Sequence, residues 1–157
     1  MITVRAMEPA DLGAVLEIEN GEPSPWSLAA LRQELEVRSG LRLVAEDAAL
    51  RIVGWCACRL MWPEVELLKI AVAKRVRRRG VGSGILNHLL ENLRHEKYSN
   101  LFLEVRAKNV AAAGFYHDHG FQQVGRRRGY YSEPKDDALL LRKDLYPSGG
   151  KSIIPPL

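Results

Sequence analysis

The residues best suited to chemistry lie in a basic, glycine-rich stretch between an apolar run and an amphipathic helix. The stretch reads AKRVRRRGVGSG over 73–84, and the apolar run LLKIAV comes directly before it. Glycine lets a ligand approach the backbone closely, and the first N–H groups of a helix have no intrahelical partner. Together with the helix dipole and the arginines, these donors predict a site for phosphate oxygens. An exposed basic turn with glycines that end a strand is the alternative reading of this stretch alone.

Two well-known phosphate loops do not fit this stretch. A Walker loop requires a lysine directly after its last glycine, and no lysine follows Gly80 or Gly82. The dinucleotide-binding fingerprint GxGxxG would require a glycine where Ile85 stands. If this stretch binds phosphate oxygens, it therefore does so as a loop of another type.

Glu104 is a candidate general base. In a strand over 101–105 the three aliphatic residues share one face, so Phe102 and Glu104 share the other. A carboxylate in partly apolar surroundings can accept a proton from a substrate, directly or through water. From the strand alone, a solvated carboxylate on the face of a sheet is the alternative.

Two tyrosines could also take part. The hydroxyl of Tyr116, with an ordinary pKa of about 10, could donate a proton to a leaving group. Its alternative is an aromatic residue on the buried side of a short helix. Tyr131 could line a substrate channel or be an ordinary strand aromatic. No histidine pair has spacing and a third ligand that would suit a metal, and we expect the thiols of Cys56 and Cys58 to be buried and reduced.

The remaining patterns predict the elements that position these residues. We expect strands over 2–5, 41–46, 52–61, 65–73, 101–105, 121–125 and 137–143, and helices over 9–20, 28–37, 84–97 and 109–119. Ser27 and Asn109 are suitable N-cap residues. The helix over 84–97 is a crossover, so the strands on either side of it should be parallel neighbours. The three strands before it should form an antiparallel meander.

Length and composition indicate one domain over 1–146 with a flexible tail over 147–157. The chain has 157 residues, of which 46% are hydrophobic and 27% charged, and no apolar run is long enough to span a membrane. The start lacks the pattern of a secretory signal, so we expect a cytoplasmic protein. The net charge is +4, and basic residues cluster at 74–79 and 126–128. Such clusters suit an anionic cofactor or an acidic or nucleic-acid-bound partner.

Three stretches, in order, resemble the GCN5-related N-acetyltransferase (GNAT) family. The sequence RRRGVG over 77–82 resembles the family's (Q/R)xxGxG/A loop. LFLEVR over 101–106 followed by Asn109, and GFY over 114–116 with Gly120-Phe121, resemble its LxLxV…N…A…LYxxxGF region. This resemblance implies an α/β (α+β) GNAT fold: a mixed, mainly antiparallel sheet flanked by helices, with two parallel central strands that splay apart. It also implies acetyl-CoA as co-substrate and no metal.

The resemblance also implies roles for individual residues. Glu104 would be the catalytic base and Tyr116 the catalytic acid. The residues that would bind the pantetheine arm, the pyrophosphate and the rest of acetyl-CoA are Ile70, Ala71 and Val72 in a strand, Arg78, Arg79, Gly80, Val81, Gly82 and Ser83 in the loop, and Asn109 at the second helix.

Within the family, the chain resembles the RimI-type ribosomal-protein-alanine N-acetyltransferases over roughly residues 1–145. The resemblance is carried by PWS over 25–27, LEVR over 103–106, and RRGYY over 127–131 before Asp137-Ala138. It implies direct acetyl transfer, in a ternary complex, to the N-terminal alanine of ribosomal protein S18, with Trp26 and Tyr131 in contact with the acceptor. We expect no membrane association and no direct nucleic-acid binding. The alternatives are acetylation of lysine or of a small amine, and a non-catalytic module that binds CoA or RNA.

The acid–base properties of amines favour an α-amine acceptor. At pH 7, deprotonation costs about 1.4 kcal/mol for an α-amine with a pKa of about 8, and about 4.6 kcal/mol for a lysine with a pKa of about 10.4. One carboxylate with a water molecule can assist the first more easily than the second, although lysine is not excluded.

Overall fold

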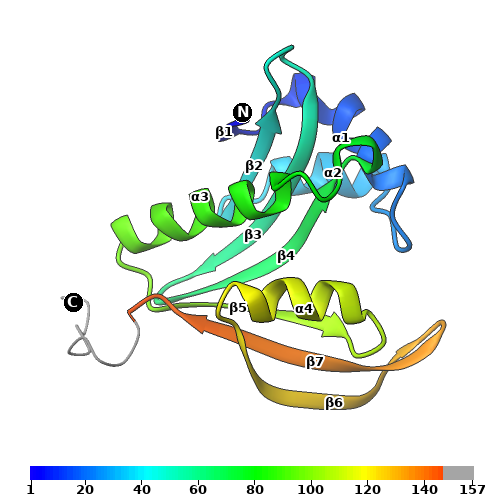
Figure 1. The fold of residues 1–157 in the computed structure, drawn as a ribbon, viewed down its shortest axis with the longest axis vertical. Helices are drawn as coiled ribbons and strands as arrows, with labels where there is room; N and C mark the ends of the chain where they lie inside the picture. Colours follow the sequence, from blue (N-terminus) through cyan, green and yellow to red (C-terminus); the bar gives the residue numbers. More distant parts are fainter. Residues whose placement is uncertain (147–157) are drawn as a thin grey trace. The chain divides into compact units, whose positions relative to one another are not determined.

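The structure is a computed structural model that describes residues 1–146; the tail predicted over 147–157 lies outside the described residues. The elements of the described residues are β1 (Thr3–Ala6), η1 (Pro9–Asp11), α1 (Leu12–Asn20), α2 (Leu28–Leu35), β2 (Gly40–Glu46), β3 (Ile52–Met61), β4 (Glu64–Val72), η2 (Lys74–Val76), α3 (Val81–His95), β5 (Asn100–Arg106), α4 (Val110–Asp118), β6 (Gln122–Ser132) and β7 (Lys135–Asp144). The strand order is β1-β2-β3-β4-β5-β7-β6 (Figure 1). This mixed, mostly antiparallel sheet with helices confirms the predicted fold class.

The chain divides into two compact units. Unit 1 comprises Met1–Leu60 and Leu67–Asn92, and unit 2 comprises Met61–Glu66 and the chain from Leu93 onwards. β4 and α3 therefore each contribute residues to both units. The single domain over 1–146 stays a prediction.

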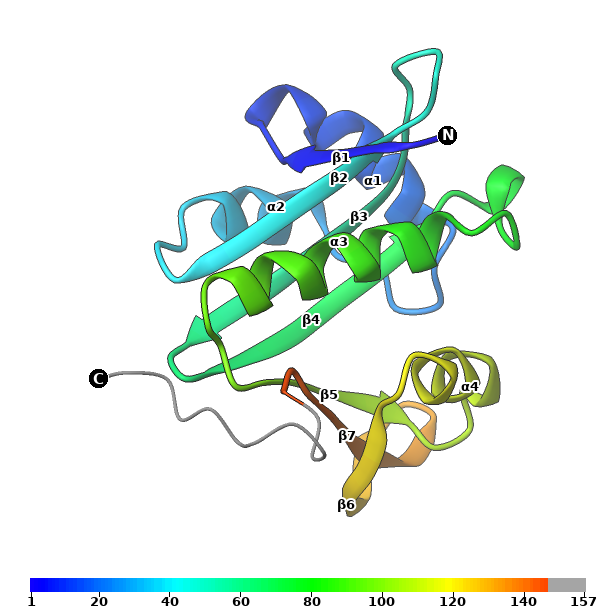
Figure 2. The ribbon, with the colours of Figure 1, turned by 60° about the vertical axis from the view of Figure 1, so that its left-hand side comes forward.

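Unit 1 has helices on both faces of its strands. β1, β2 and β3 form antiparallel ladders, with α1 and α2 on one face and α3 on the other (Figures 1 and 2). A core fills the face covered by α1 and α2; its buried members are Met7, Val15, Ile18, Leu31, Val44, Trp55, Ala57, Ala71 and Ala73. Cys56 and Cys58 alternate with Trp55 and Ala57 along β3, and both are buried free thiols as predicted.

Unit 2 contains the parallel pair that the crossover helix predicted. β4 and β5 pair in parallel from Glu64–Asn100 to Glu66–Phe102. β5 then pairs antiparallel with β7, and β7 with β6. The predicted end of the strand over 121–125 is wrong, because β6 continues to Ser132. Three consecutive arginines and Gly129 interrupt the alternating pattern that would have revealed its length.

The local rules for helix starts hold at two sites and give the wrong residue at a third. Ser27 Oγ accepts a hydrogen bond from Ala30 N at 3.1 Å, and the Asn109 side chain accepts one from Ala112 N at 3.1 Å, so both predicted N-caps are confirmed. α3 begins at Val81, three residues before the predicted start at Gly84. Its first turn closes where Gly84 N donates to Gly80 O at 2.9 Å.

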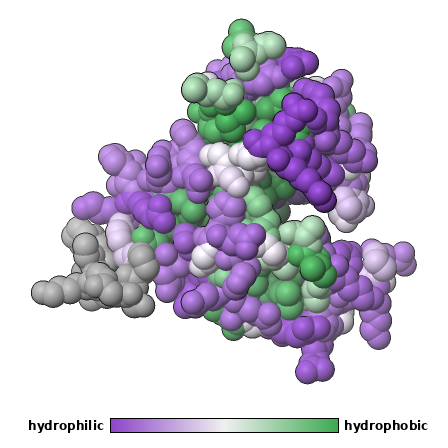
Figure 3. All heavy atoms as spheres, viewed as in Figure 1, coloured by the Kyte–Doolittle hydropathy of each residue, from purple (hydrophilic) through white to green (hydrophobic). Residues whose placement is uncertain are grey.

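Hydrophilic side chains dominate the view in Figure 3. Among the described residues, no helix combines the length and the apolar character that crossing a bilayer requires.

Candidate active site

The basic loop of unit 1 has an unusual backbone. Arg78 has φ +64° and Gly80 has φ +81°, both in the left-handed region. Glycine adopts this region without strain, whereas it is uncommon for other residues. Because Gly84 N is the donor to Gly80 O, the N–H groups of residues 81–83 belong to the first turn, which has no intrahelical acceptors. The loop therefore ends at a helix start with free donors, beside the exposed side chains of Arg78 and Arg79.

Two other glycines hold the start of α3 in place. A Cβ atom on Gly54 of β3 would lie 2.7 Å from Ile85 Cδ1 and 3.2 Å from Val81 Cγ1, so α3 packs directly on the bare backbone of β3. A Cβ on Gly84 would lie 2.7 Å from Ile2 Cδ1. From its place in the glycine-rich stretch, Gly84 was expected to face the ligand. In the structure it instead makes room for the side chain of Ile2 in the N-terminal segment.

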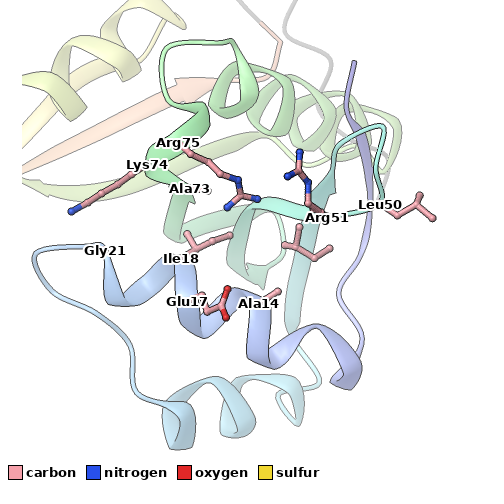
Figure 4. A pocket seen from close by; sticks show the side chains of 10 residues that line it. Ala14, Glu17, Ile18, Gly21, Leu50, Arg51, Ala73, Lys74 and Arg75 are labelled. Carbon is pink, nitrogen blue, oxygen red and sulfur yellow. The ribbon is translucent and has the colours of Figure 1, made fainter.

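The basic cluster over 74–79 separates into groups with different surroundings. Arg77 donates from Nη2 to Glu22 Oε2 at 3.0 Å and from Nε to Val72 O at 3.1 Å, which ties the loop to the end of β4. Lys74 and Arg75 instead line a surface pocket of about 690 Å³ over α1, together with Arg51 (Figure 4). The cluster is thus less uniform than its spacing suggested.

The cations of this pocket also have local partners. The Lys74 stem lies close to Gly21 at the end of α1, where an added Cβ would meet Lys74 Cε at 3.3 Å. Arg51 Nη2 lies 2.9 Å from Asp47 Oδ2. These contacts account for the placement of Lys74 and Arg51 without a ligand.

The predicted cofactor strand lies at the end of β4. Ala71 is buried in the core under α1 and α2, whereas Ile70 and Val72, which alternate with it, are only partly buried. The proposed contacts of residues 70–72 with acetyl-CoA use the backbone, and they stay a prediction.

In unit 2, Glu104 lies in a charged and aromatic cluster. β5 alternates between buried and partly buried residues, which confirms that Glu104 shares a face with Phe102. The Glu104 carboxylate is 22% exposed, and its Oε1 lies 3.4 Å from Arg127 Nε. The pKa of Tyr131 is raised above its ordinary value, mainly by burial and secondly by the negative charge of Glu104. Arg106 lies over the Tyr131 ring, with Cζ 4.1 Å from the ring centroid.

The other predicted residues of unit 2 lie on α4. Tyr116 is buried, and its ring packs edge-on against Phe115 and Phe121 with centroid distances of 5.3 Å. Asn109 caps α4 through its side-chain oxygen. Burial of Tyr116 between aromatic rings fits a structural as well as a catalytic residue, so its role stays a prediction.

Trp26, a predicted acceptor contact in unit 1, is held by a buried carboxylate. Its backbone N–H donates to Glu19 Oε1 at 3.0 Å, and Trp55 Nε1 donates to Glu19 Oε2 at 3.1 Å. Lys69 Nζ lies 3.4 Å from Glu19 Oε1. The ring of Trp26 packs edge-on against Trp55 at 5.4 Å. Glu19 thus fixes the segment between α1 and α2 to the strands of unit 1.

Sequence reasoning missed the partners of Glu104. Arg127 was recognised only as part of a family motif, and its contact with Glu104 depends on pairing across three strands. The motif over 127–131 before Asp137 was the available sign of it. Among the described residues, no group of three or more His, Cys, Asp or Glu side chains could hold a metal ion.

Comparisons with known proteins agree with these observations. The model of the acetyltransferase (GNAT) family matches residues 12–121. The chain is 32% identical over 145 residues to the [ribosomal protein bS18]-alanine N-acetyltransferase of Salmonella typhimurium, covering 90% of this chain and 96% of that protein. It is 34% identical over 155 residues to the N-alpha-acetyltransferase RimI of Mycobacterium tuberculosis, covering 91% and 92%.

A solved structure is also similar. The crystal structure of the ribosomal-protein-S18-alanine N-acetyltransferase from Escherichia coli superposes with a TM-score of 0.86 at 28% identity, covering 98% of this chain and 99% of that one. The family match and these relatives show that the chain belongs to the GNAT family of acetyltransferases and is an N-acetyltransferase.

Proposed function

We propose that this enzyme transfers the acetyl group of acetyl-CoA to the N-terminal α-amine of a protein, and that this amine is the alanine of ribosomal protein bS18. The observation that carries the proposal is the match with the bS18-alanine N-acetyltransferase of Salmonella typhimurium, because it extends over nearly the whole of both chains. A match of that length includes the segments that would contact the acceptor as well as the proposed cofactor loop.

The loop of unit 1 fits the diphosphate of acetyl-CoA. The left-handed Gly80, the N–H groups of residues 81–83 and two exposed guanidinium groups, on Arg78 and Arg79, supply donors and positive charge at one place. When bound, acetyl-CoA supplies an activated acetyl thioester. Residues 70–72 would hold the pantetheine arm through backbone hydrogen bonds, and Asn109 would contact the cofactor at the start of α4.

In the proposed chemistry, Glu104 accepts a proton from the acceptor ammonium, directly or through water. The free amine then forms the new N–C bond, and the nitrogen releases its second proton to water. The C–S bond breaks, Tyr116 donates its proton to the departing thiolate, and Tyr116 is reprotonated from solvent. Transfer is direct, within a ternary complex and without an acyl-enzyme. Trp26 and Tyr131 would contact the acceptor peptide.

The acceptor can be tested with a peptide that copies the N-terminus of bS18 and also contains lysine. After reaction with acetyl-CoA, tandem mass spectrometry should place one acetyl group on the N-terminal alanine. The same peptide with a blocked N-terminus is the control and should remain unmodified. Equal acetylation of lysine in the blocked peptide, or turnover only with small amines, would overturn the acceptor assignment.

A further inference from the structure

β6 contains a bulge directly opposite Asp137. Arg127 pairs with Ala138 and Tyr131 pairs with Asp136, so three residues of β6 stand opposite Asp137 alone. The middle one, Gly129, has φ +61° and open space where a Cβ would lie. A bulge of this kind changes where the flanking side chains point.

The side chain of Asp137 binds the middle of this bulge and the strand just before it. Gly129 N donates to Asp137 Oδ1 at 2.7 Å, and Arg126 Nε donates to Asp137 Oδ2 at 2.7 Å. The hydrogen bond from Gly129, followed by the contact with Arg126, holds the pKa of Asp137 below its ordinary value. The carboxylate therefore stays ionised at neutral pH and remains a strong acceptor for the bulge.

Two arginines beside the bulge, one on each neighbour of β7, lie on the face of Glu104. Arg106 of β5 and Arg127 of β6 both pair with Ala138, and directly opposite residues of an antiparallel ladder point to one face. Glu104 lies two residues before Arg106 and shares that face. The ladder brings Arg127 Nε to 3.4 Å from Glu104 Oε1.

The bulge also sets the position of Tyr131. Without the extra residues, Gly129 rather than Tyr131 would stand opposite Asp136. With them, Tyr131 lies under Arg106, at 4.1 Å from ring centroid to Cζ, and Arg106 donates to the backbone oxygens of Pro134 and Glu133. The bulge therefore places one cation and one phenol around the carboxylate of the proposed base.

We propose that Asp137 is a positioning residue for acetyl transfer: by holding the β6 bulge, it keeps Arg127 on Glu104, and Arg127 orients one carboxylate oxygen and leaves the other for the acceptor. This inference rests on the proposed function, because Glu104 is the base there. Asp137 itself need not touch substrate.

A double-mutant cycle tests this route. Asp137→Asn should lower kcat with the bS18 peptide about tenfold, as expected for loss of the ion pair between Arg127 and Glu104 that orients the base. In an Arg127→Gln background the same substitution should change kcat less than about twofold, because the contact of Arg127 with Glu104 that Asp137 supports is already absent. Asp144→Asn is the matched control: this exposed carboxylate lies on the same strand, 3.3 Å from Arg142, and the variant should keep wild-type kcat. An equal loss from Asp137→Asn in both backgrounds, or none in either, would overturn the proposal.

Substitutions at Gly129 give an independent reading if Asp137→Asn unfolds the hairpin. Asn tolerates the left-handed region and Val does not. Gly129→Asn should therefore keep most of the activity, whereas Gly129→Val should lose as much kcat as Asp137→Asn; equal activities in the two variants would contradict the role of the bulge.

If the wild-type enzyme does not acetylate the peptide, the proposed function fails; if it does and Asp137→Asn matches Asp144→Asn, only the present inference fails.

Discussion

At the scale of single residues, the proposed chemistry depends on what surrounds one carboxylate. Glu104 is partly buried on β5, with Arg127 beside it and Tyr131 close enough for its charge to raise the tyrosine pKa. A carboxylate fixed by one guanidinium has a defined free oxygen, which suits a base that must accept a proton from one direction. Tyr116 has a different, aromatic environment on α4.

Substitution of the proposed acid and base should affect turnover more than stability. We expect Glu104→Gln to lower kcat by about 10²–10³-fold, and Tyr116→Phe by about 10–10²-fold, in steady-state assays with the bS18 peptide. Tyr98→Phe, which removes the hydroxyl of a tyrosine packed edge-on against Trp62, is the control and should leave kcat unchanged. Full turnover in either test variant would remove that residue from the mechanism.

An ion pair near the N-terminus makes stability depend on pH. Arg5 binds both carboxylate oxygens of Asp11 at 2.8 Å, and this hydrogen bonding is the main reason that the pKa of Asp11 is lowered. A lowered carboxyl pKa stabilises the fold above the unfolded pKa of about 3.9, and the contribution is lost as pH falls through the folded value.

Arg5→Gln, which also removes the contact of Arg5 Nε with Glu46, should therefore reduce the free energy of unfolding by about 1–3 kcal/mol at pH 7. The difference from wild type should shrink as pH falls below about 4. Urea titrations of both proteins at several pH values measure this difference in the free energy of unfolding. A difference that stays constant down to pH 2 would show that the carboxylate is not the partner that matters.

At the scale of elements, α3 and β3 together set the geometry of the proposed cofactor loop. The helix packs on β3 at Gly54, with Val81 and Ile85 above the glycine, and both of these side chains are buried. The first turn of α3, with its free N–H groups, is thus held by the core of unit 1. The loop before it has less support, apart from the hydrogen bonds of Arg77.

A side chain at position 54 should disturb the start of α3. Gly54→Val would push against Ile85 and Val81, and we expect a loss of stability of about 1–3 kcal/mol with a severalfold higher KM for acetyl-CoA. Gly13→Ala is the matched control, because nothing lies within 4 Å of its added Cβ. In helix α1 it should leave KM unchanged and slightly raise the thermal midpoint. An unchanged KM for acetyl-CoA in Gly54→Val would show that the packing of α3 on Gly54 does not affect cofactor binding.

At the scale of the whole molecule, the positive charge is distributed unevenly and partly neutralised. The net charge is +4, but Arg77, Arg126 and Arg127 each lie within 3.4 Å of a carboxylate oxygen. The exposed Arg78 and Arg79 remain beside the α3 N-terminus. The charge is therefore better suited to one small polyanion at the loop than to an extended nucleic-acid surface.

Salt should weaken cofactor binding through these arginines. Raising KCl from about 0.05 to 0.5 M shortens the Debye length from roughly 14 to 4 Å, so the KM for acetyl-CoA should rise severalfold. In an Arg78→Gln/Arg79→Gln variant KM should be higher at low salt and less sensitive to salt. If the KM for acetyl-CoA depends on salt identically in the wild type and this variant, the diphosphate does not bind beside Arg78 and Arg79.

The sequence predicted what depends on local patterns, and it missed what depends on pairing. Ser27 and Asn109 were recognised as caps because capping needs only a few neighbouring residues. The parallel pairing of β4 and β5 followed from the crossover rule. The length of β6 and the contact of Arg127 with Glu104 were not predictable, since a bulge opposite Asp137 shifts the register by means of contacts made across strands. The roles of the site residues came from family resemblance and remain to be tested.

A survey of protein N-termini in cells is the sharpest test of the proposal that this enzyme acetylates the N-terminal alanine of bS18. Mass spectrometry would compare N-terminal acetylation in cells with the wild-type gene, a deletion, and a Glu104→Gln replacement. We predict that acetylated bS18 is present in the first and lost in the other two, while lysine acetylation is unchanged. Unaltered bS18 acetylation in the deletion strain, with losses among lysines or small amines instead, would contradict the account.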